Sequence, residues 1–292
     1  MSHLIPTTAI DALMKGPSLT KTQQVAALHN HIRDLLEPDY HIFLQGSYKN
    51  DTAPSDINDV DIVAVRKKTY SGTYSPHPTT TTIAWKTIVD EIITKLLQDN
   101  TYGWNIESGD KCIKLEGVFN VDVIPAVVYN DHEEDPIVVY SFKDGKEIIN
   151  RPRLHYTNGV AKHEATSKLY KPTVRMFKNW KQNHYGQEKD TVSSFKIEAL
   201  VHSADDAHFV SDGAACFILV GENILERLNL RSLAPTSIMS VCGGEDITAN
   251  WDLAARRRFV DQLTASVQHA RQAYNAGNQS LAEAHWDLAF NQ

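Results

Sequence analysis

Two segments in the first half of the chain repeat apolar residues at helical spacing. The first, residues 18–36 (SLTKTQQVAALHNHIRDLL), begins with Ser and Thr, which cap helix N-termini. Its apolar positions, three or four residues apart, are Val25, Leu28, Ile32, Leu35 and Leu36. The second, residues 83–97 (IAWKTIVDEIITKLL), has similar spacing. Both patterns predict amphipathic helices.

Short apolar runs between and after these helices have the pattern of strands. They are IFLQGS (42–47), VDIVAV (60–65), KCIKLEG (111–117) and VFNVDVIPAVVY (118–129). The first ends in a glycine turn, and Pro125 predicts that the last lies at a sheet edge or stops pairing there. The polar stretch 68–82, which contains two prolines, predicts a long loop.

The second half of the chain has the pattern of helices. Strand signals almost vanish after about residue 160, and the expected helices are 166–183, 194–203, 213–229 and 253–289. We find no internal repeat. The pattern therefore predicts an α+β domain over residues 1–160 and a helical domain over residues 161–292, packed together.

Composition narrows the function classes. The 292 residues carry a formal charge of −7, so a polyanion would have to bind at a local basic patch. No run of about 18 apolar residues occurs, and the N-terminus lacks the layout of a signal peptide, so we expect a cytoplasmic protein without membrane contact. The three cysteines are odd in number and far apart, which argues against a disulfide framework or a zinc cluster.

Candidate chemistry lies in the stretch 46–65, GSYKNDTAPSDINDVDIVAV. Residues two apart on a strand share a face, so Asp59 and Asp61 present their carboxylates side by side. In VFNVDVIPAV, alternation places Asp122 on the face opposite the apolar residues Phe119 and Val121. Like charges at this spacing repel unless a cation lies between them, and hard cations such as Mg²⁺ prefer oxygen ligands. Three such carboxylates can hold two metal ions about 3.5–4 Å apart.

The Gly-Ser pair before these strands suits a phosphate. Gly46 lets the backbone approach a phosphate without a Cβ, and Ser47 can donate a hydrogen bond to its oxygens. The pair alone is a weak signal. A Gly-Ser pair followed by a D-x-D strand, with a third aspartate in a later strand, is a strong signal.

These motifs resemble the DNA polymerase beta type of nucleotidyltransferase, with its Gly-Ser turn, D-x-D strand and third aspartate. GSY, DVDIVAV and VDVIPA are similar to the bacterial cGAS/DncV-like nucleotidyltransferases (CD-NTases) of CBASS antiphage systems, and RMFKNW, SSFKIEALVH and AEAHWDLAF fit that family's helical half. The resemblance implies a mixed β-sheet domain packed on a C-terminal helical domain, bilobal with a central cleft. It also implies catalysis at Asp59, Asp61 and Asp122 with two Mg²⁺ or Mn²⁺ ions.

A set of basic residues marks the helical half. Lys168, Lys171, Arg175 and Lys178 recur at steps of three and four, which predicts one basic helix face. Such a stripe suits a triphosphate, and its alternative is a solvated lysine face. The family resemblance implies that Lys178 and Ser194 contact the donor's terminal phosphate and that Phe195 contacts its base. The alternative for Phe195 is a core residue.

The resemblance implies an enzyme that joins nucleoside triphosphates, ATP among them, into a cyclic di- or trinucleotide that switches on an effector of cell suicide. A terminal transferase acting on RNA and a transferase acting on a protein or small molecule are the alternatives. A pI near 6.0 argues against a broad RNA surface, so we expect no stable nucleic-acid binding. A binding-only pseudoenzyme would lack an aspartate, and all three are present. The bases, the ring size, the trigger and any regulatory partner are left open.

Overall fold

The chain folds into two compact units. The computed structural model describes residues 3–71, 84–99, 101–130, 132–186, 191–228 and 237–292. One unit comprises Pro17–Tyr156, and the other comprises Met1–Gly16 with Thr157–Gln292. The sequence predicts a division after residue 160, whereas here it falls at Tyr156, and the first 16 residues group with the helical unit.

The sheet unit is built on a mixed seven-stranded sheet in the described part of the chain. Its elements are α2 (Leu19–Leu36), β1 (Tyr40–Gln45), α3 (Gly46–Asn50), β2 (Asp59–Ser71), α4 (Trp85–Leu97), β3 (Asn105–Ser108), β4 (Ile113–Glu116), β5 (Asn120–Tyr129), β6 (His132–Ser141) and β7 (Lys146–Asn150). The strand order is β1-β2-β5-β4-β3, and β6 pairs with β5 and β7. The central pair, β2 and β5, is parallel, and the other pairs are antiparallel. The predicted α+β class is confirmed.

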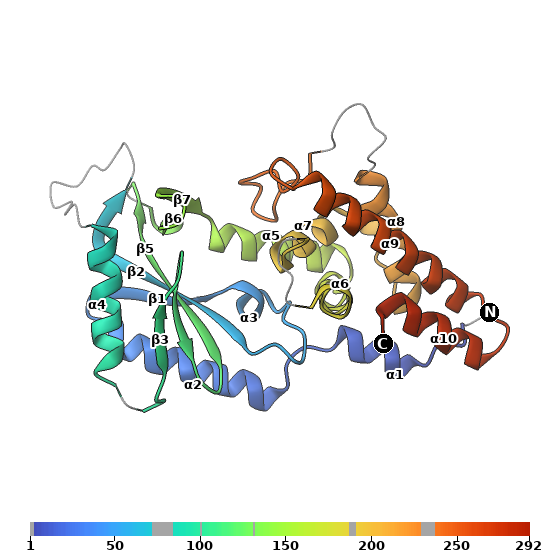
Figure 1. Ribbon diagram of the computed structural model, residues 1–292, viewed down its shortest axis with the longest axis horizontal. Helices are drawn as coiled ribbons and strands as arrows, with labels where there is room; N and C mark the ends of the chain where they lie inside the picture. The colour runs from blue at the N-terminus through green and yellow to red at the C-terminus, as the bar shows by residue number, and fades with distance from the viewer. Residues whose placement is uncertain (1–2, 72–83, 100, 131, 187–190, 229–236) are drawn as a thin grey trace. The chain divides into compact units, whose positions relative to one another are not determined.

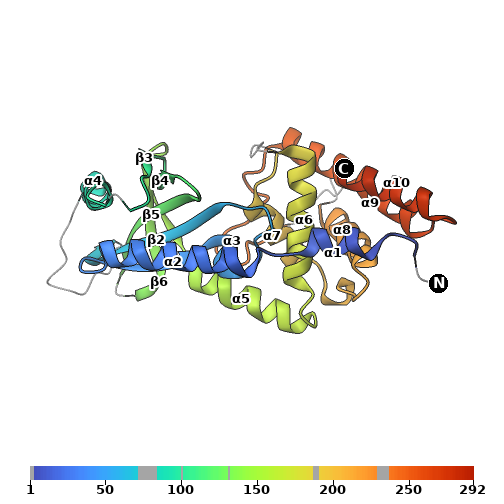
Figure 2. The same ribbon diagram turned by 90° about the horizontal axis from the view of Figure 1, so that it is seen from below.

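The two faces of the sheet differ in what covers them. α2 and α4 pack on one face, where Ile62 and Val123 belong to the large apolar cluster of this unit (Figures 1 and 2). Residues on the other face, among them Val63 and Ala126, form a smaller cluster. Strand alternation therefore directs successive β2 and β5 side chains to these two environments.

The edge position predicted for the last strand is wrong, because β5 lies in the middle of the sheet. Pro125 sits where one neighbour of β5 ends and another begins: β4 pairs as far as Val123, and β6 pairs from Ala126. A proline without an N–H is tolerated in a central strand at such a gap. The predicted end of pairing near Pro125 is therefore correct for β4, whose pairing with β5 reaches only to Val123.

Several elements differ from the expected ones. β2 continues to Ser71, so residues 68–71 of the expected loop are strand. The rest of that loop, residues 72–82, lies outside the described residues. β3, β6 and β7 are not predicted by the sequence, because they are short or lack clean alternation.

The helical unit consists mainly of helices packed around one aromatic core. They are α1 (Thr7–Met14), α5 (Pro152–Ala165), α6 (Tyr170–Tyr185), α7 (Ser194–Ser203), η1 (Asp206–His208), α8 (Gly213–Arg227), α9 (Leu253–Tyr274) and α10 (Gln279–Phe290). The division between the units falls within α5. At the centre, the Phe217 ring lies 4.8 Å from that of Phe177 and 4.7 Å from that of Phe290.

Two helix boundaries depend on local backbone conformation. The helix expected from residue 166 starts at Tyr170, because Ser167 and Lys168 have positive φ angles of 50° and 68°. The helix expected over 253–289 is two helices, and Asn278 caps the second through its side chain. No helix in the described ranges combines the length and apolarity that a bilayer crossing requires.

Gly213, the first residue of α8, lies where α1 packs against α8. A Cβ at this position would lie 2.5 Å from Cγ2 of Ile10 and 2.9 Å from Sδ of Met14, both on α1. We expect Gly213→Ala to lower the free energy of unfolding by about 1–3 kcal/mol through overpacking. Urea denaturation measures this change.

Gly159→Ala in α5 is the matched control, since its added Cβ would meet only Cε1 of Tyr170 at 3.8 Å. That variant should be neutral or gain up to about 1 kcal/mol from helix propensity. Equal unfolding midpoints for the two variants would show that α1 does not pack closely on Gly213.

Candidate active site

A row of polar side chains crosses the middle of the sheet. In register, Gln45 of β1 pairs with Asp61 of β2, Asp61 with Asp122 of β5, and Asp122 with Lys114 of β4. Neighbouring strands lie about 4.7–4.9 Å apart, so the two carboxylates are adjacent. Asp59 is two residues before Asp61 and shares its face. The structure thus brings the three predicted aspartates together, on the face opposite α2 and α4.

The position of Asp59 depends on contacts from two sides. It pairs in register with Asn120, whose Nδ2 donates to Asp59 Oδ1 at 3.3 Å. The Tyr48 hydroxyl donates to the Ile57 carbonyl at 3.1 Å and so fixes the chain just before Asp59. Burial, and then the charge of Asp59, raise the pKa of Tyr48. The phenol therefore stays protonated and remains a donor.

Gly46 is required by its contact with Asp61. Its φ is +67°, and a Cβ built on it would lie 2.0 Å from Asp61 Oδ2. The sequence predicts that the missing Cβ admits a phosphate, whereas the structure gives the Asp61 carboxylate as the neighbour that excludes a side chain. Ser47 follows as the second residue of α3. The Gly-Ser turn and the D-x-D strand are thus in direct contact.

The sequence gives no chemical role to two residues beside Asp122. Lys114 is its partner in register on β4, and Cys112 lies on the same face two residues earlier. Burial, and then the charge of Asp122, to which the thiol donates, raise the pKa of Cys112 to about 12. The alternation of KCIKLEG places Cys112 and Lys114 on one face, but only the register shows that they flank Asp122.

Carboxylate oxygens are the donors that a hard divalent cation prefers. Among the described residues, no three His, Cys, Asp or Glu side chains are grouped so that they could hold a metal ion by themselves. Mg²⁺ usually binds through one or two carboxylates together with substrate phosphates and water. An adjacent carboxylate pair with a third carboxylate on the same face therefore fits Mg²⁺ or Mn²⁺ in its donor chemistry, as an open set of ligands.

Of the predicted basic stripe, Lys171, Arg175 and Lys178 lie on α6 at steps of four and three and so share a helix face. Lys168 precedes α6 in a left-handed conformation. Arg175 Nε donates to the carbonyl of Met14 at 2.6 Å, at the end of α1. Lys178 Nζ forms an ion pair with Glu198 of α7 at 2.9 Å, with side-chain exposures of 5% and 6%. The alternative of a solvated lysine face is therefore wrong at Lys178, which is buried.

α7 carries two further predicted residues. Ser193 caps the helix, and Ser194, its first residue, is exposed. Ser194 and Glu198 are four residues apart and so lie on the same side of α7. Phe195 is 39% exposed, so its alternative as a core residue is wrong.

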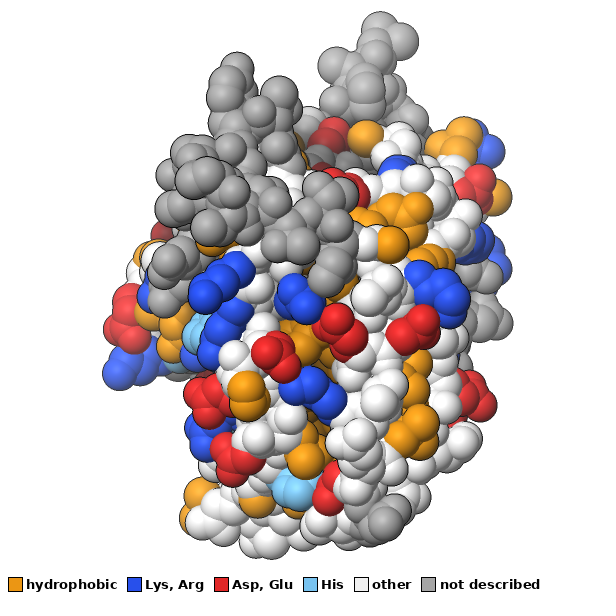
Figure 3. All heavy atoms as spheres, turned by 90° about the vertical axis from the view of Figure 1, so that its left-hand side faces the viewer, with side chains coloured by type: hydrophobic (Ala, Val, Ile, Leu, Met, Phe, Trp, Pro, Cys, Tyr) orange, Lys and Arg blue, Asp and Glu red, His pale blue; other side chains and the backbone are white. Residues whose placement is uncertain are grey.

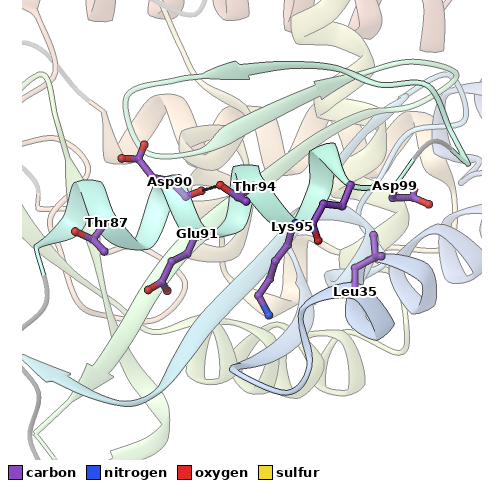
Figure 4. Close-up of a pocket in the computed structure, with 8 residues that line it drawn as sticks. Leu35, Thr87, Asp90, Glu91, Thr94, Lys95 and Asp99 are labelled. Atoms are coloured by element: carbon purple, nitrogen blue, oxygen red, sulfur yellow. Dashed lines mark hydrogen bonds between the residues drawn. The ribbon is translucent and has the colours of Figure 1, made fainter.

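One surface groove lies away from these aspartates. It measures about 700 Å³ and is lined by α4 and by Leu35 of α2, the helices on the other face of the sheet (Figure 4). Its charged residues already have partners: Asp90 with Lys86, Glu91 with Arg66, Lys95 with Asp39 and Asp99 with His31. In Figure 3, basic and acidic side chains are interspersed over the part of that face that the structure describes. We assign no chemistry to this groove.

Comparison with known proteins identifies the class that this fold and this arrangement of carboxylates define. Residues 157–268 match the family model of the cGAS/DncV-like nucleotidyltransferase C-terminal helical domain. The chain is 34% identical over 204 residues to "Cyclic nucleotide synthase CdnE01" of Staphylococcus haemolyticus, covering 60% of this chain and 66% of that protein. It is 35% identical over 195 residues to "Cyclic dipurine nucleotide synthase" of Elizabethkingia meningoseptica, covering 58% of this chain and 65% of that protein.

The fold agrees with a solved structure over nearly its whole length. The c-UMP-AMP synthase CdnE of Rhodothermus marinus, solved with Apcpp and Upnpp, superposes with a TM-score of 0.72 at 22% identity, covering 94% of this chain and 99% of that one. The chain is similar to the cGAS/DncV-like nucleotidyltransferases, and its residues 157–268 match the C-terminal helical domain of that family. Its alignments span just under two thirds of the length of the two curated relatives named above.

The environment of Cys112 gives a test of the geometry around Asp122 that does not depend on activity. With a pKa of about 12, the Cys112 thiol stays protonated at neutral pH and should alkylate slowly. Asp122→Asn removes a negative charge that opposes the thiolate, so the pKa should fall. Each unit of that fall raises the thiolate fraction about tenfold. The measurement is iodoacetamide labelling at pH 8, followed by mass spectrometry.

Cys242 provides the internal control, because it lies in the helical unit and its labelling should not change. An unchanged labelling rate at Cys112 in the Asp122→Asn protein would mean that the thiol and the carboxylate are not neighbours.

Proposed function

We propose that this protein joins nucleoside triphosphates into a cyclic di- or trinucleotide second messenger and releases pyrophosphate. The observation that carries the proposal is the in-register pairing of Asp61 with Asp122, with Asp59 on the same face, in a chain of this family. The named relatives are cyclic nucleotide synthases, which supports the same reaction class here.

Asp59, Asp61 and Asp122 would hold two Mg²⁺ or Mn²⁺ ions. When bound, such ions stabilise the charge that develops on the attacking and leaving oxygens. Asp122 helps to take the proton from the attacking ribose hydroxyl. The hydroxyl oxygen bonds to the donor α-phosphorus as the bond from that phosphorus to the bridging oxygen breaks, and pyrophosphate leaves. The linear product then turns round, and a second transfer closes the ring.

Residues outside the aspartates would bind the donor nucleotide. Ser47, next to Gly46, donates a hydrogen bond to its phosphates. In the helical unit, Ser194 and Lys178 hold the terminal phosphate, with Lys171 and Arg175 contributing positive charge. The Lys178–Glu198 and Arg175–Met14 contacts mean that these two cations must share or exchange partners when a phosphate arrives. The exposed Phe195 ring is available to stack on a base.

The bases of the product differ among relatives. The Elizabethkingia meningoseptica protein is named for a dipurine product, whereas the Rhodothermus marinus protein is named for c-UMP-AMP. We therefore propose ATP as one substrate and leave the second base open. By its family the protein acts in the cytoplasm in antiphage defence, and its product activates a downstream effector. A regulatory partner is left open, and we propose no stable nucleic-acid or membrane binding.

The direct test is incubation with the four nucleoside triphosphates and Mg²⁺ or Mn²⁺. A phosphatase-resistant product whose mass matches a cyclic dinucleotide or trinucleotide supports the proposal. A product that phosphatase degrades, or a tail added to RNA, supports a linear or terminal transferase instead.

The aspartates provide the first variant. We expect Asp59→Asn with Asp61→Asn to abolish the product, because the anionic ligands are lost. The melting temperature without metal should be unchanged or higher, since repulsion with Asp122 falls. Asp56→Asn, in the exposed loop before β2, is the matched control and should keep activity. Product above a few per cent of wild type from the double variant would contradict the assignment.

The start of α7 provides the second set of variants. Ser194→Ala and Phe195→Ala should raise the KM for triphosphate with little change in melting temperature, because both side chains are exposed. Lys178→Ala should also destabilise the fold, by about 3–5 kcal/mol, since it leaves the buried Glu198 charge unpaired. Steady-state kinetics and thermal denaturation measure both effects. A large stability loss from Phe195→Ala with an unchanged KM would exclude stacking.

A further inference from the structure

Asp59 is the most exposed of the three aspartates and the first residue of β2. A carboxylate at such a position has rotamer freedom that a strand interior would remove. A metal ligand with this freedom binds less well, because ordering it costs conformational entropy. A neighbouring group that holds the Asp59 carboxylate in one orientation would therefore strengthen metal binding.

Asn120 is placed to do this. The parallel register sets Asn120 opposite Asp59, as it sets Asp122 opposite Asp61, so the four residues form two successive cross-strand pairs. The backbone fixes the pairing, since the N–H of Asn120 donates to the carbonyl of Asn58 at 3.1 Å. The Asn120 amide Nδ2 then donates to Asp59 Oδ1 at 3.3 Å.

An amide side chain suits the position opposite Asp59 better than a carboxylate or an apolar side chain would. A fourth carboxylate would add a charge that repels Asp59, and an apolar side chain would leave Asp59 free to rotate. A neutral amide donates a hydrogen bond without adding charge. By engaging Oδ1 it leaves Oδ2 for another partner.

We propose that Asn120 is a positioning residue, which orients Asp59 through the Nδ2 to Oδ1 hydrogen bond so that the other carboxylate oxygen faces the divalent cation. This inference rests on the proposed function, because it assumes that Asp59 is a metal ligand. Partners of this kind typically change metal affinity or activity by about 10–100-fold.

The same sheet contains a matched control. Asn105 of β3 pairs in register with Glu116 of β4, and its Nδ2 donates to Glu116 Oε2, also at 3.3 Å. This pair repeats the cross-strand contact between an amide and a carboxylate, away from the three aspartates. Asn105→Leu therefore reports what loss of such a contact does to the sheet alone.

The first experiment is Mn²⁺ binding to the full chain without nucleotide, followed by electron paramagnetic resonance of the free ion. We expect Asn120→Leu, which keeps the shape of the side chain but cannot donate, to weaken binding about 10–100-fold. Asn105→Leu should bind as wild type does. Asn120→Ala gives the same comparison if the leucine side chain disturbs folding.

The second experiment is the metal dependence of product formation. In Asn120→Leu the Mn²⁺ concentration that gives half-maximal rate should rise by the same factor, and the rate at saturating Mn²⁺ should approach that of wild type. A purely structural residue would change the melting temperature without this rescue by metal.

The possible results distinguish a failure of the role proposed for Asn120 from a failure of the proposed function. If wild type makes the cyclic product and Asn120→Leu keeps both its Mn²⁺ affinity and its metal dependence, the role of Asn120 is wrong and the proposed function stands. A rate loss in Asn120→Leu that saturating Mn²⁺ does not restore also overturns it. If wild type neither binds Mn²⁺ nor makes product, the proposed function fails together with this inference.

Discussion

Repulsion between neighbouring carboxylates is the constraint around which the sheet unit is arranged. Asp61 and Asp122 are paired in register on two parallel strands, and both are partly buried. Two like charges so placed are unfavourable without a cation. The surroundings moderate this cost by a protonated thiol at Cys112, a lysine in register at Lys114 and an amide at Asn120. Asn120 belongs to β5, Lys114 belongs to β4 and Cys112 directly precedes β4, so the site depends on the sheet order β2-β5-β4.

The sheet holds the carboxylates on a rigid support. The apolar residues of β2 and β5 that point away from the site pack under α2 and α4. Gly46 fits directly against Asp61, which ties the Gly-Ser turn to the strand pair. Nucleotide chemistry requires that its reacting groups be held within narrow limits, and a site on strand positions meets that requirement better than one on loops.

The helical unit holds its cations in contacts with other protein groups. Lys178 is neutralised by Glu198 inside the unit, and Arg175 binds the last carbonyl of α1. A buried ion pair is costly to break on one side only, so Lys178 and Glu198 also fix α6 to α7. The start of α7, with Ser194 and Phe195 exposed, is thereby held on a defined helix.

The sequence by itself determined the features that depend on local periodicity. Alternation placed Asp59, Asp61 and Asp122 on faces opposite buried neighbours, and the helices α2, α4 and α7 follow from apolar spacing and capping residues. The Gly-Ser turn, the D-x-D strand and the third strand aspartate indicate the family without any tertiary contact.

Only the tertiary structure decided which of these residues meet. The pairing of Asp61 with Asp122, of Lys178 with Glu198 and of Arg175 with Met14 joins residues far apart along the chain. Strand register and helix packing fix such contacts, and a period of two or of 3.6 residues carries no information about either. The even spacing of the basic residues predicted the shared face of Lys171, Arg175 and Lys178, but not the left-handed backbone at Lys168. The role proposed for Asn120 likewise depends on its partner in register.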